Sequence, residues 1–168
     1  MYYAVSRKNR SHLQRYEAGN VLLSIETIDD AANLVQELAQ GWAEGSYFFL
    51  GAFDKTDDEF VAQVYIGSVN SDLPEFSIGY IVDIDHEGQG YVTEAVQVVL
   101  ELLFSRLNAH RVTINTDDTN FRSQRVAERC GFVKEGHIRE NKSNPDGTIT
   151  GTYHYGLLKC EYEDRCKT

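Results

Sequence analysis

The sequence predicts a single α/β domain, with a mixed, mostly antiparallel sheet, one central parallel pair of strands, and helices on its faces. An apolar run at 75–84, a helical pattern at 90–107 and an alternating run at 111–116 follow one another. Such a strand–helix–strand unit places its two strands in parallel. Pairs of strands joined by short polar turns come before and after it, at 47–69 and 132–160, and such hairpins are antiparallel.

Length and composition are those of one globular domain. The chain has 168 residues, of which 42% are hydrophobic and 25% are charged, and a chain of this size can bury a sizeable core. It contains no internal repeat, no low-complexity tract and no linker rich in Pro, Gly or Ser. We therefore expect residues 1–168 to form a single domain.

Two helices are predicted before the first hairpin. Residues 4–17 have the pattern of a short polar helix, and residues 29–44 have that of an amphipathic helix with Asp29 or Asp30 near its N-cap. The hairpin consists of YFFLGAFD and EFVAQVYIGSV, which the polar turn KTDD joins. The strand EFSIGYIVDI follows.

The second half of the chain alternates helices and strands. The helix predicted at 90–107 has an apolar stripe at i, i+3, i+4, i+7 spacing. The stripe comprises Val92, Ala95, Val96, Val99, Leu103 and Leu107. The strand RVTINT comes next, and then a helix at 120–130 that Gly131 ends. Two closing strands, 132–140 and 148–160, flank the turn sequence NPDG.

The charge balance excludes some partners. The net charge is −10, so we expect no binding to nucleic acid, which requires cationic side chains, whereas an amine substrate is compatible. No apolar stretch approaches the about 20 residues of a membrane span, and the start MYYAVSRKNR lacks an apolar signal region. Three cysteines without metal-binding spacing favour a reducing cytoplasm, with no disulfide and no metal site.

The segment HEGQGYVTEA places Gly88 and Gly90 where a strand meets a helix. A helix N-terminus presents unpaired N–H groups and about half a positive charge, and glycines let the backbone approach an anion. This combination is typical of a phosphate or pyrophosphate site, to which Thr93 could add a hydroxyl donor. The P-loop pattern is absent, and the GxGxxG pattern of dinucleotide folds fails at Thr93. On these residues alone, a tight turn without a ligand stays open as the alternative.

Together with this loop, the order of elements, the segment TDDTNFRSQRVAERCGF and the ending YGLLK resemble the GNAT superfamily of acyl-CoA-dependent N-acetyltransferases. The resemblance is strongest over residues 76–160 and is closest to the RimJ/RimL-type branch, which acetylates N-terminal residues of ribosomal proteins. It implies acetyl-CoA as co-substrate, with the strand before the loop bonded to the pantetheine arm and the loop N–H groups holding the pyrophosphate. The implied cofactor-binding residues are Ile81, Val82, Asp83, Glu87, Gly88, Gln89, Gly90, Tyr91, Val92, Thr93 and Asn120.

The chain departs from the superfamily pattern in the loop and at its start. Glu87 stands where the superfamily has Gln or Arg, and Val92 stands where it has Gly or Ala. Because a carboxylate repels a pyrophosphate, we expect Glu87 to point to solvent. Relatives also have a strand before the segment that matches YYAVSRKNRSHLQRY, and this sequence has none. We expect either that the sheet lacks this edge strand or that the true start lies upstream.

Acetyl transfer from a thioester needs a donor for the oxyanion and a proton for the leaving sulfur. The resemblance implies a backbone N–H near Val82 or Asp83 as the oxyanion donor, and such donors contribute about 3 kcal/mol. It implies Ser123 as the proton donor, beside Asn120, because the two match an Asn-x-x-Ser pair of this branch. From the residues alone, Asn120 is equally a helix N-cap with Ser123 in the first turn.

The sequence leaves the general base open. Candidates on the strand after Gly131 are Glu135, His137 and Glu140, and we take Glu140 as the hypothesis. Some relatives use a glutamate at a place that falls on Lys142 here, so the family's base does not carry over. An α-amine needs little help, because its neutral form costs only about 1 kcal/mol at pH 7, against about 4.6 kcal/mol for a lysine.

The implied function is direct transfer of an acetyl group from acetyl-CoA to a primary amine, since no nucleophile with a base partner is evident. The first choice of acceptor is a protein or peptide N-terminal α-amine, and a small amine such as a polyamine, amino acid or aminoglycoside is the alternative. A non-catalytic acyl-CoA-binding module and a nucleotide-binding domain are the rival functions.

Four aromatic residues either line the acceptor pocket or pack in the core: Trp42, Tyr47, Phe48 and Phe49. An uncovered sheet edge would favour a homodimer.

Overall fold

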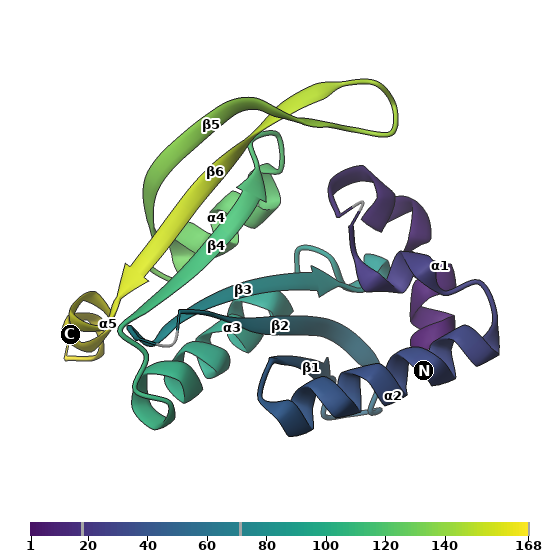
Figure 1. Ribbon diagram of the computed structural model, residues 1–168, viewed down its shortest axis with the longest axis horizontal. Helices are drawn as coiled ribbons and strands as arrows, with labels where there is room; N and C mark the ends of the chain where they lie inside the picture. Colours follow the sequence, from purple (N-terminus) through teal and green to yellow (C-terminus); the bar gives the residue numbers. More distant parts are fainter. Residues whose placement is uncertain (18, 71, 168) are drawn as a thin grey trace.

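The predicted sheet is present in the computed structural model, which describes residues 1–17, 19–70 and 72–167 (Figure 1). In this part of the chain the strands are β1 (Tyr47–Phe53), β2 (Phe60–Asn70), β3 (Glu75–Val82), β4 (Arg111–Asp117), β5 (Val133–Ser143) and β6 (Ile149–Leu158). They form one sheet in the order β1-β2-β3-β4-β6-β5. All neighbours are antiparallel except β3 and β4, which are parallel. The predicted fold class is therefore confirmed.

Helices precede, connect and follow the strands. They are α1 (Tyr2–Tyr16), α2 (Ile28–Glu44), α3 (Tyr91–Glu101), α4 (Phe121–Arg129) and α5 (Lys159–Cys166), with 3-10 turns η1 (Val21–Ser24) and η2 (Ile84–His86) and a π-helical turn η3 (Leu102–Arg106). No helix in the described ranges is long and apolar enough to cross a membrane.

The ends of two elements are fixed by side-chain caps. The N-cap of α2 is Thr27, with Asp29 and Asp30 in the first turn, as the prediction of an acidic residue near the cap requires. The Thr27 hydroxyl accepts the Asp30 N–H at 3.1 Å, and the Asp30 carboxylate accepts the Thr27 N–H at 2.7 Å. Asp30 is thus the inner partner of a capping box. The last strand ends at Leu158 because α5 begins there, and the Glu161 carboxylate accepts the Leu158 N–H at 2.9 Å.

Apolar side chains gather on both faces of the sheet. One cluster joins α3 and α4 to the strands, as with Val96 and Ala127, and the other joins α1, η1 and α2 to Ile81 of β3. Leu13 of α1 and Leu22 of η1 are buried in this second cluster. The sheet therefore has packed helices on each side, and α1 and α2 belong to one of them.

The apolar stripe of the central helix is buried as far as Leu103 but not beyond it. Val96, Val99 and Leu103 are buried, whereas Leu107 is 43% exposed. The Leu107 N–H donates to the Leu102 carbonyl at 3.1 Å, a five-residue spacing that belongs to the π-turn. This wider turn rotates the end of the helix, so Leu107 leaves the stripe.

The parallel pair at the centre is short. Residues Glu75–Ser77 of β3 face Arg111–Thr113 of β4, and the pairing stops there. Figure 1 shows the two strands spreading apart toward α1. Backbone groups that no longer pair across the break become available to a ligand.

Candidate active site

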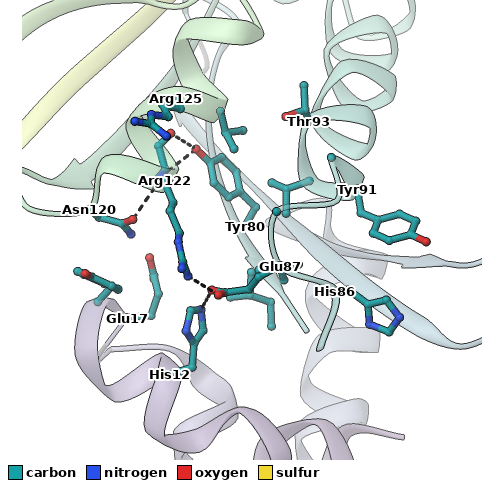
Figure 2. Close-up of a pocket in the computed structure, with 18 of the residues that line it drawn as sticks. His12, Glu17, Tyr80, His86, Glu87, Tyr91, Thr93, Asn120, Arg122 and Arg125 are labelled. Carbon is teal, nitrogen blue, oxygen red and sulfur yellow. Dashed lines mark hydrogen bonds and ion pairs between the residues drawn. The ribbon is translucent and has the colours of Figure 1, made fainter. Parts of the chain in front are cut away.

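A cavity of about 340 Å³ opens where β3 and β4 diverge. The end of α1, the end of β3, the loop before α3, the first turn of α3 and one face of α4 form its walls (Figure 2). The predicted site residues that line it are Ile81, Val82, Glu87, Gly88, Gly90, Tyr91, Val92, Thr93, Asn120 and Ser123. Asp83, Gln89 and Glu140 are not part of this lining.

The glycine loop has a backbone conformation that favours glycine. Gly88 and Gly90 have φ angles of 75° and 93°, in the left-handed region. A Cβ at either position would meet no atom within 4 Å, so open space lies beside the loop. Gly90 is the N-cap of α3, and no described side chain caps this helix. Its first N–H groups and its positive dipole end are therefore left for an anion.

Three arginines of α4 form a cationic face on another wall. Arg122, Arg125 and Arg129 are three and four residues apart, so they share one side of the helix, and all three line the cavity. Guanidinium groups and loop N–H groups are the donors that a phosphate or pyrophosphate requires. Sequence reasoning missed this face, although the spacing of arginines in FRSQRVAER was a signal for it.

Glu87 does not point to solvent, and that expectation was wrong. Its side chain is only 19% exposed and forms an ion pair with Arg122, and one carboxylate oxygen lies 3.3 Å from Nε2 of His12 (Figure 2). The expectation considered repulsion by a ligand but not the arginine that α4 places across the loop. His12 and Arg122 therefore hold this carboxylate at the cavity wall.

The end of β3 presents alternate backbone groups to the cavity. The Asp83 N–H donates to the Val61 carbonyl at 2.9 Å, so it is taken by the neighbouring chain segment. Successive N–H groups of a strand point to opposite edges, and the Val82 N–H therefore points to the edge from which β4 has diverged. Of the two oxyanion donors considered, this geometry leaves Val82.

The Asp83 side chain anchors α1. It is buried, forms an ion pair with Lys8 at 2.7 Å and accepts a hydrogen bond from Nδ2 of Asn9 at 3.1 Å. Burial alone would raise the pKa of this carboxyl, but the bonds from Lys8 and Asn9 outweigh burial, and the pKa lies below its ordinary value. Oδ1 of Asn9 also accepts the Ile84 N–H at 2.8 Å, which fastens α1 to the end of β3.

Ser123 and Asn120 meet in the first turn of α4. Asn120 is the N-cap, and its Oδ1 accepts the Ser123 N–H at 3.1 Å. The Ser123 hydroxyl lies 2.9 Å from the Tyr80 hydroxyl, which also donates to the Ser123 carbonyl at 2.9 Å. Burial raises the pKa of Tyr80 well above its ordinary value, so Tyr80 stays protonated. Sequence reasoning did not single out Tyr80, because its partner lies on a distant helix.

The base candidates on β5 lie away from the cavity. Glu140 is exposed, has a φ of 51° and occupies an irregular part of the strand. Glu135 accepts a hydrogen bond from Arg111 at 2.7 Å, and Nε2 of His137 lies 2.8 Å from a carboxylate oxygen of Asp118. These three side chains are engaged or exposed elsewhere, and none of them lines the cavity.

Glu17 brings a carboxylate to the cavity that sequence reasoning missed. It is the C-cap of α1 and lies on the α1 side of the cavity, opposite Asn120 (Figure 2). The side chain is exposed but lies in a concavity, and the loss of surrounding water raises the pKa of its carboxyl, an effect that Lys142 opposes. The residue ends a polar helix, so no periodic pattern marks it.

The aromatic residues considered as pocket or core divide between the two roles. Trp42 and Phe48 pack edge to face, with ring centroids 4.9 Å apart. Tyr47 and Phe49 line a second cavity, of about 460 Å³. Phe48 also packs against the buried core, whereas Trp42 is 52% exposed, so the core interpretation applies to Phe48 and the pocket interpretation to Tyr47 and Phe49.

A splayed parallel pair, a glycine loop at a helix N-terminus and a cationic helix face define an α/β domain whose cavity has the donors that a phosphate-bearing ligand requires. In residues 1–17, 19–70 and 72–167, no group of three or more His, Cys, Asp or Glu side chains is placed to hold a metal ion. The family profile described as "Acetyltransferase (GNAT) domain" matches residues 3–133. The chain belongs to this GNAT acetyltransferase family, which confirms the resemblance seen in the sequence.

Individual proteins support this assignment. The chain is 31% identical over 116 residues to the probable N-acetyltransferase YjcK of Bacillus subtilis (strain 168), and the match covers 68% of this chain and 64% of that protein. It is similar in structure to the ribosomal-protein-S5-alanine acetyltransferase from Vibrio fischeri, with a TM-score of 0.83, 20% identity and coverage of 96% and 87% of the two chains. RimL, a ribosomal L7/L12 α-N-protein acetyltransferase in complex with coenzyme A, gives a TM-score of 0.83 at 19% identity, covering 93% and 85%. At these identities the two solved structures establish the fold.

Proposed function

We propose that this chain is an N-acetyltransferase that moves the acetyl group of acetyl-CoA to a primary amine in a ternary complex. The observation that carries the proposal is the meeting of three features in one cavity: the Gly88–Gly90 loop, the arginine face of α4 and the free edge of β3 at Val82. They fit a ligand that has a pyrophosphate and an arm able to hydrogen-bond along a strand. RimL, which is similar in fold, was solved with coenzyme A.

Val82 and Ser123 serve the thioester in this proposal. The Val82 N–H donates to the carbonyl oxygen as it gains negative charge, which contributes about 3 kcal/mol. Ser123 gives its hydroxyl proton to the leaving sulfur, and Tyr80, whose hydroxyl is 2.9 Å away, orients that hydroxyl. The described lining of the cavity contains no cysteine, and Ser123 contacts a tyrosine rather than a base. Direct attack by the amine is therefore favoured over a covalent acetyl-enzyme.

The proposed acceptor is a protein or peptide N-terminal α-amine. The neutral form of an α-amine costs only about 1 kcal/mol at pH 7, so a modest carboxylate suffices as base. The names of the two similar structures describe acetylation of ribosomal proteins. A small-molecule amine is the alternative. We also propose a cytoplasmic protein, on the basis of its cysteine content, without a nucleic-acid partner, on the basis of its net charge of −10. A homodimer formed through an uncovered sheet edge is proposed as well.

The test is amine-dependent release of free CoA thiol from acetyl-CoA, with short peptides and small primary amines as acceptors. A ternary-complex enzyme gives intersecting initial-rate lines when both substrates are varied, and the acetyl group appears on the amine nitrogen by mass spectrometry. Tight binding of acetyl-CoA without turnover of any amine would instead favour the non-catalytic acyl-CoA-binding module.

A further inference from the structure

The second cavity adjoins the first near the end of β3 and extends from there between α2 and the sheet. Side chains alternate along a strand, and Tyr80 packs with the α3 side of the sheet, whereas Ile81 packs with α1 and α2. The second cavity is enclosed by α2, β1, β2 and the segment after α1, on the Ile81 side. Glu17, Tyr80 and Ile81 line both cavities, so the two spaces adjoin at these residues.

Rings and aliphatic side chains dominate this second lining. Phe49 lies with its ring centroid 6.1 Å from that of Tyr47 and 5.0 Å from that of Tyr65. Leu34 and Leu38 of α2 lie across from these strands. An apolar group that enters this space exchanges water for ring and methyl contacts.

The charged side chains of the lining determine whether a cationic or an anionic ligand is favoured. Its described residues include the carboxylates of Glu17 and Glu37 and no Lys, Arg or His. The first cavity contains the carboxylates of Glu17 and Glu87 but adds three arginines on one helix face. A cationic amine is therefore favoured in the second cavity, and an anionic phosphate group is favoured beside the arginines of the first.

Glu17 stands where these two regions join. Tyr80 of β3 and His12 of α1 line the first cavity with it, and Arg122 and Arg125 reach the same cavity from α4. Lys142 of β5 donates to the Tyr16 carbonyl at 3.0 Å and lies 3.4 Å from Asp117 of β4, which fixes the end of α1. Lys142 and Asp117 act on the Glu17 charge in opposite directions, and reduced hydration leaves the pKa of Glu17 raised.

We propose that Glu17 takes the proton from the acceptor amine, and that the second cavity receives an amine borne on an aromatic or branched apolar group. This rests on the proposed function and narrows its acceptor class. The lining favours one amine beside one bulky apolar group, as in a peptide whose first residue is aromatic. It disfavours polyamines and aminoglycosides, whose several charges and hydroxyls would meet mostly rings and methyl groups.

The proton and electron balance is complete with the residues present. Glu17 takes one proton from the ammonium and passes it to solvent, which reaches this exposed side chain. The nitrogen lone pair forms the C–N bond, and the second proton leaves the nitrogen to Glu17, which passes it to solvent and is again a carboxylate. The C–S bond then breaks with its electron pair on sulfur, which takes the Ser123 proton, and solvent restores that proton. The products are an amide, a free thiol and one released proton.

The acceptor class is tested with four amines at saturating acetyl-CoA: phenylalanine amide, alanine amide, phenethylamine and spermidine. We expect kcat/KM for phenylalanine amide to exceed that for alanine amide by about tenfold or more, because the ring is buried. Phenethylamine should likewise exceed spermidine. Phe49→Ala should bring the first ratio toward one, while stabilisation by acetyl-CoA shows that the variant is folded. Equal or better use of alanine amide or spermidine by the wild type would overturn the class.

The role of Glu17 is tested with Glu17→Gln, which keeps the size and removes the base. We expect kcat to fall about hundredfold, the KM for acetyl-CoA to stay within about twofold, and the acid limb of the kcat–pH profile to disappear. Because the pKa is raised, that limb lies above the ordinary value of 4.5, and wild-type activity falls as the pH drops through it. Glu17→Asp should retain the limb. Glu44→Gln, at the exposed end of α2 and outside both cavities, is the matched control and should change neither quantity.

The possible results distinguish a failure of this inference from a failure of the proposed acetyltransferase function. If Glu17→Gln turned over amines with an unchanged kcat, Glu17 would not be the general base, but the proposed acetyltransferase activity would be unaffected. Binding of acetyl-CoA by the wild type, without turnover of any of the four amines or of peptides, would contradict the acetyltransferase itself.

Discussion

The Ser123 hydroxyl is positioned by Tyr80, and the Ser123 N–H is held by Asn120. Because the helix cap uses the N–H and not the hydroxyl, Ser123→Ala removes the proposed proton donor and keeps the cap. We expect kcat to fall about hundredfold with the Kd for acetyl-CoA within about twofold of wild type. Tyr80→Phe, which keeps the ring, should give a smaller fall. A Ser123→Ala enzyme with wild-type kcat would show that sulfur takes its proton from elsewhere.

A phosphate of acetyl-CoA that bound Arg122, as proposed, would compete with Glu87 for this side chain. Glu87→Gln removes a negative charge from the cavity wall and frees the guanidinium, so we expect acetyl-CoA to bind about threefold to tenfold more tightly by calorimetry. Arg122→Gln should weaken binding by a similar factor, since this arginine is 74% exposed and screened. Both effects should shrink in high salt. Weaker binding by Glu87→Gln would mean that this carboxylate supports the loop conformation rather than opposing the ligand.

At the level of elements, α1 forms a wall of the cavity only while it is fastened to the end of β3. Asp83 makes this connection through its ion pair with Lys8 and its hydrogen bond from Asn9. We expect Asp83→Ala to lower the free energy of unfolding by about 2 kcal/mol, since buried hydrogen bonds to a charged group are lost. Asp85→Ala is the matched control: that carboxylate also contacts Lys8 but is 69% exposed, and about 0.5 kcal/mol or less is expected. Equal losses of unfolding free energy for the two variants, measured by urea unfolding, would contradict the claim that Asp83 fastens α1 to the end of β3.

The contribution of Asp83 to the free energy of unfolding has a defined pH dependence. The pKa of Asp83 is lowered from 3.8 in the folded chain, so its contribution is complete above the unfolded value and is lost as the pH falls through the lower, folded value. The difference in unfolding free energy between wild type and Asp83→Asn should therefore be constant from neutral pH to about pH 5, and should shrink below 3.8. A difference that changed between about pH 7 and pH 5 would contradict the assignment of this effect to the Asp83 carboxyl.

The elements could be predicted where the pattern is local. Alternation and turn residues located the strands, and the apolar spacing located α3, because each signal lies within the segment itself. The N-terminus of α2 was located near Asp29 and Asp30, but Thr27 was not named as the cap, because it lies outside the apolar pattern. The π-turn after α3 and the start of α5 depend on contacts at the helix ends, which periodicity does not report.

At the scale of the whole molecule, the candidate site combines segments that only the fold brings together. The glycine loop could be predicted because its glycines and its helix start are contiguous in HEGQGYVTEA. Glu17 and Tyr80 could not, because they acquire significance from a cavity that joins α1, β3 and α4. The same reason explains Glu87: its solvent exposure was inferred from repulsion by a pyrophosphate, whereas Arg122, which pairs with it, comes from another helix.

The central claim is that this cavity binds acetyl-CoA, and thermal unfolding with added ligands tests it most directly. At about 100 times its Kd, a ligand adds about 2.7 kcal/mol of stability, which raises Tm measurably. We predict a rise with acetyl-CoA and with CoA, and none of similar size with NAD, ATP or inorganic phosphate at matched concentration. No rise with acetyl-CoA, or a larger rise with NAD or ATP, would contradict the account.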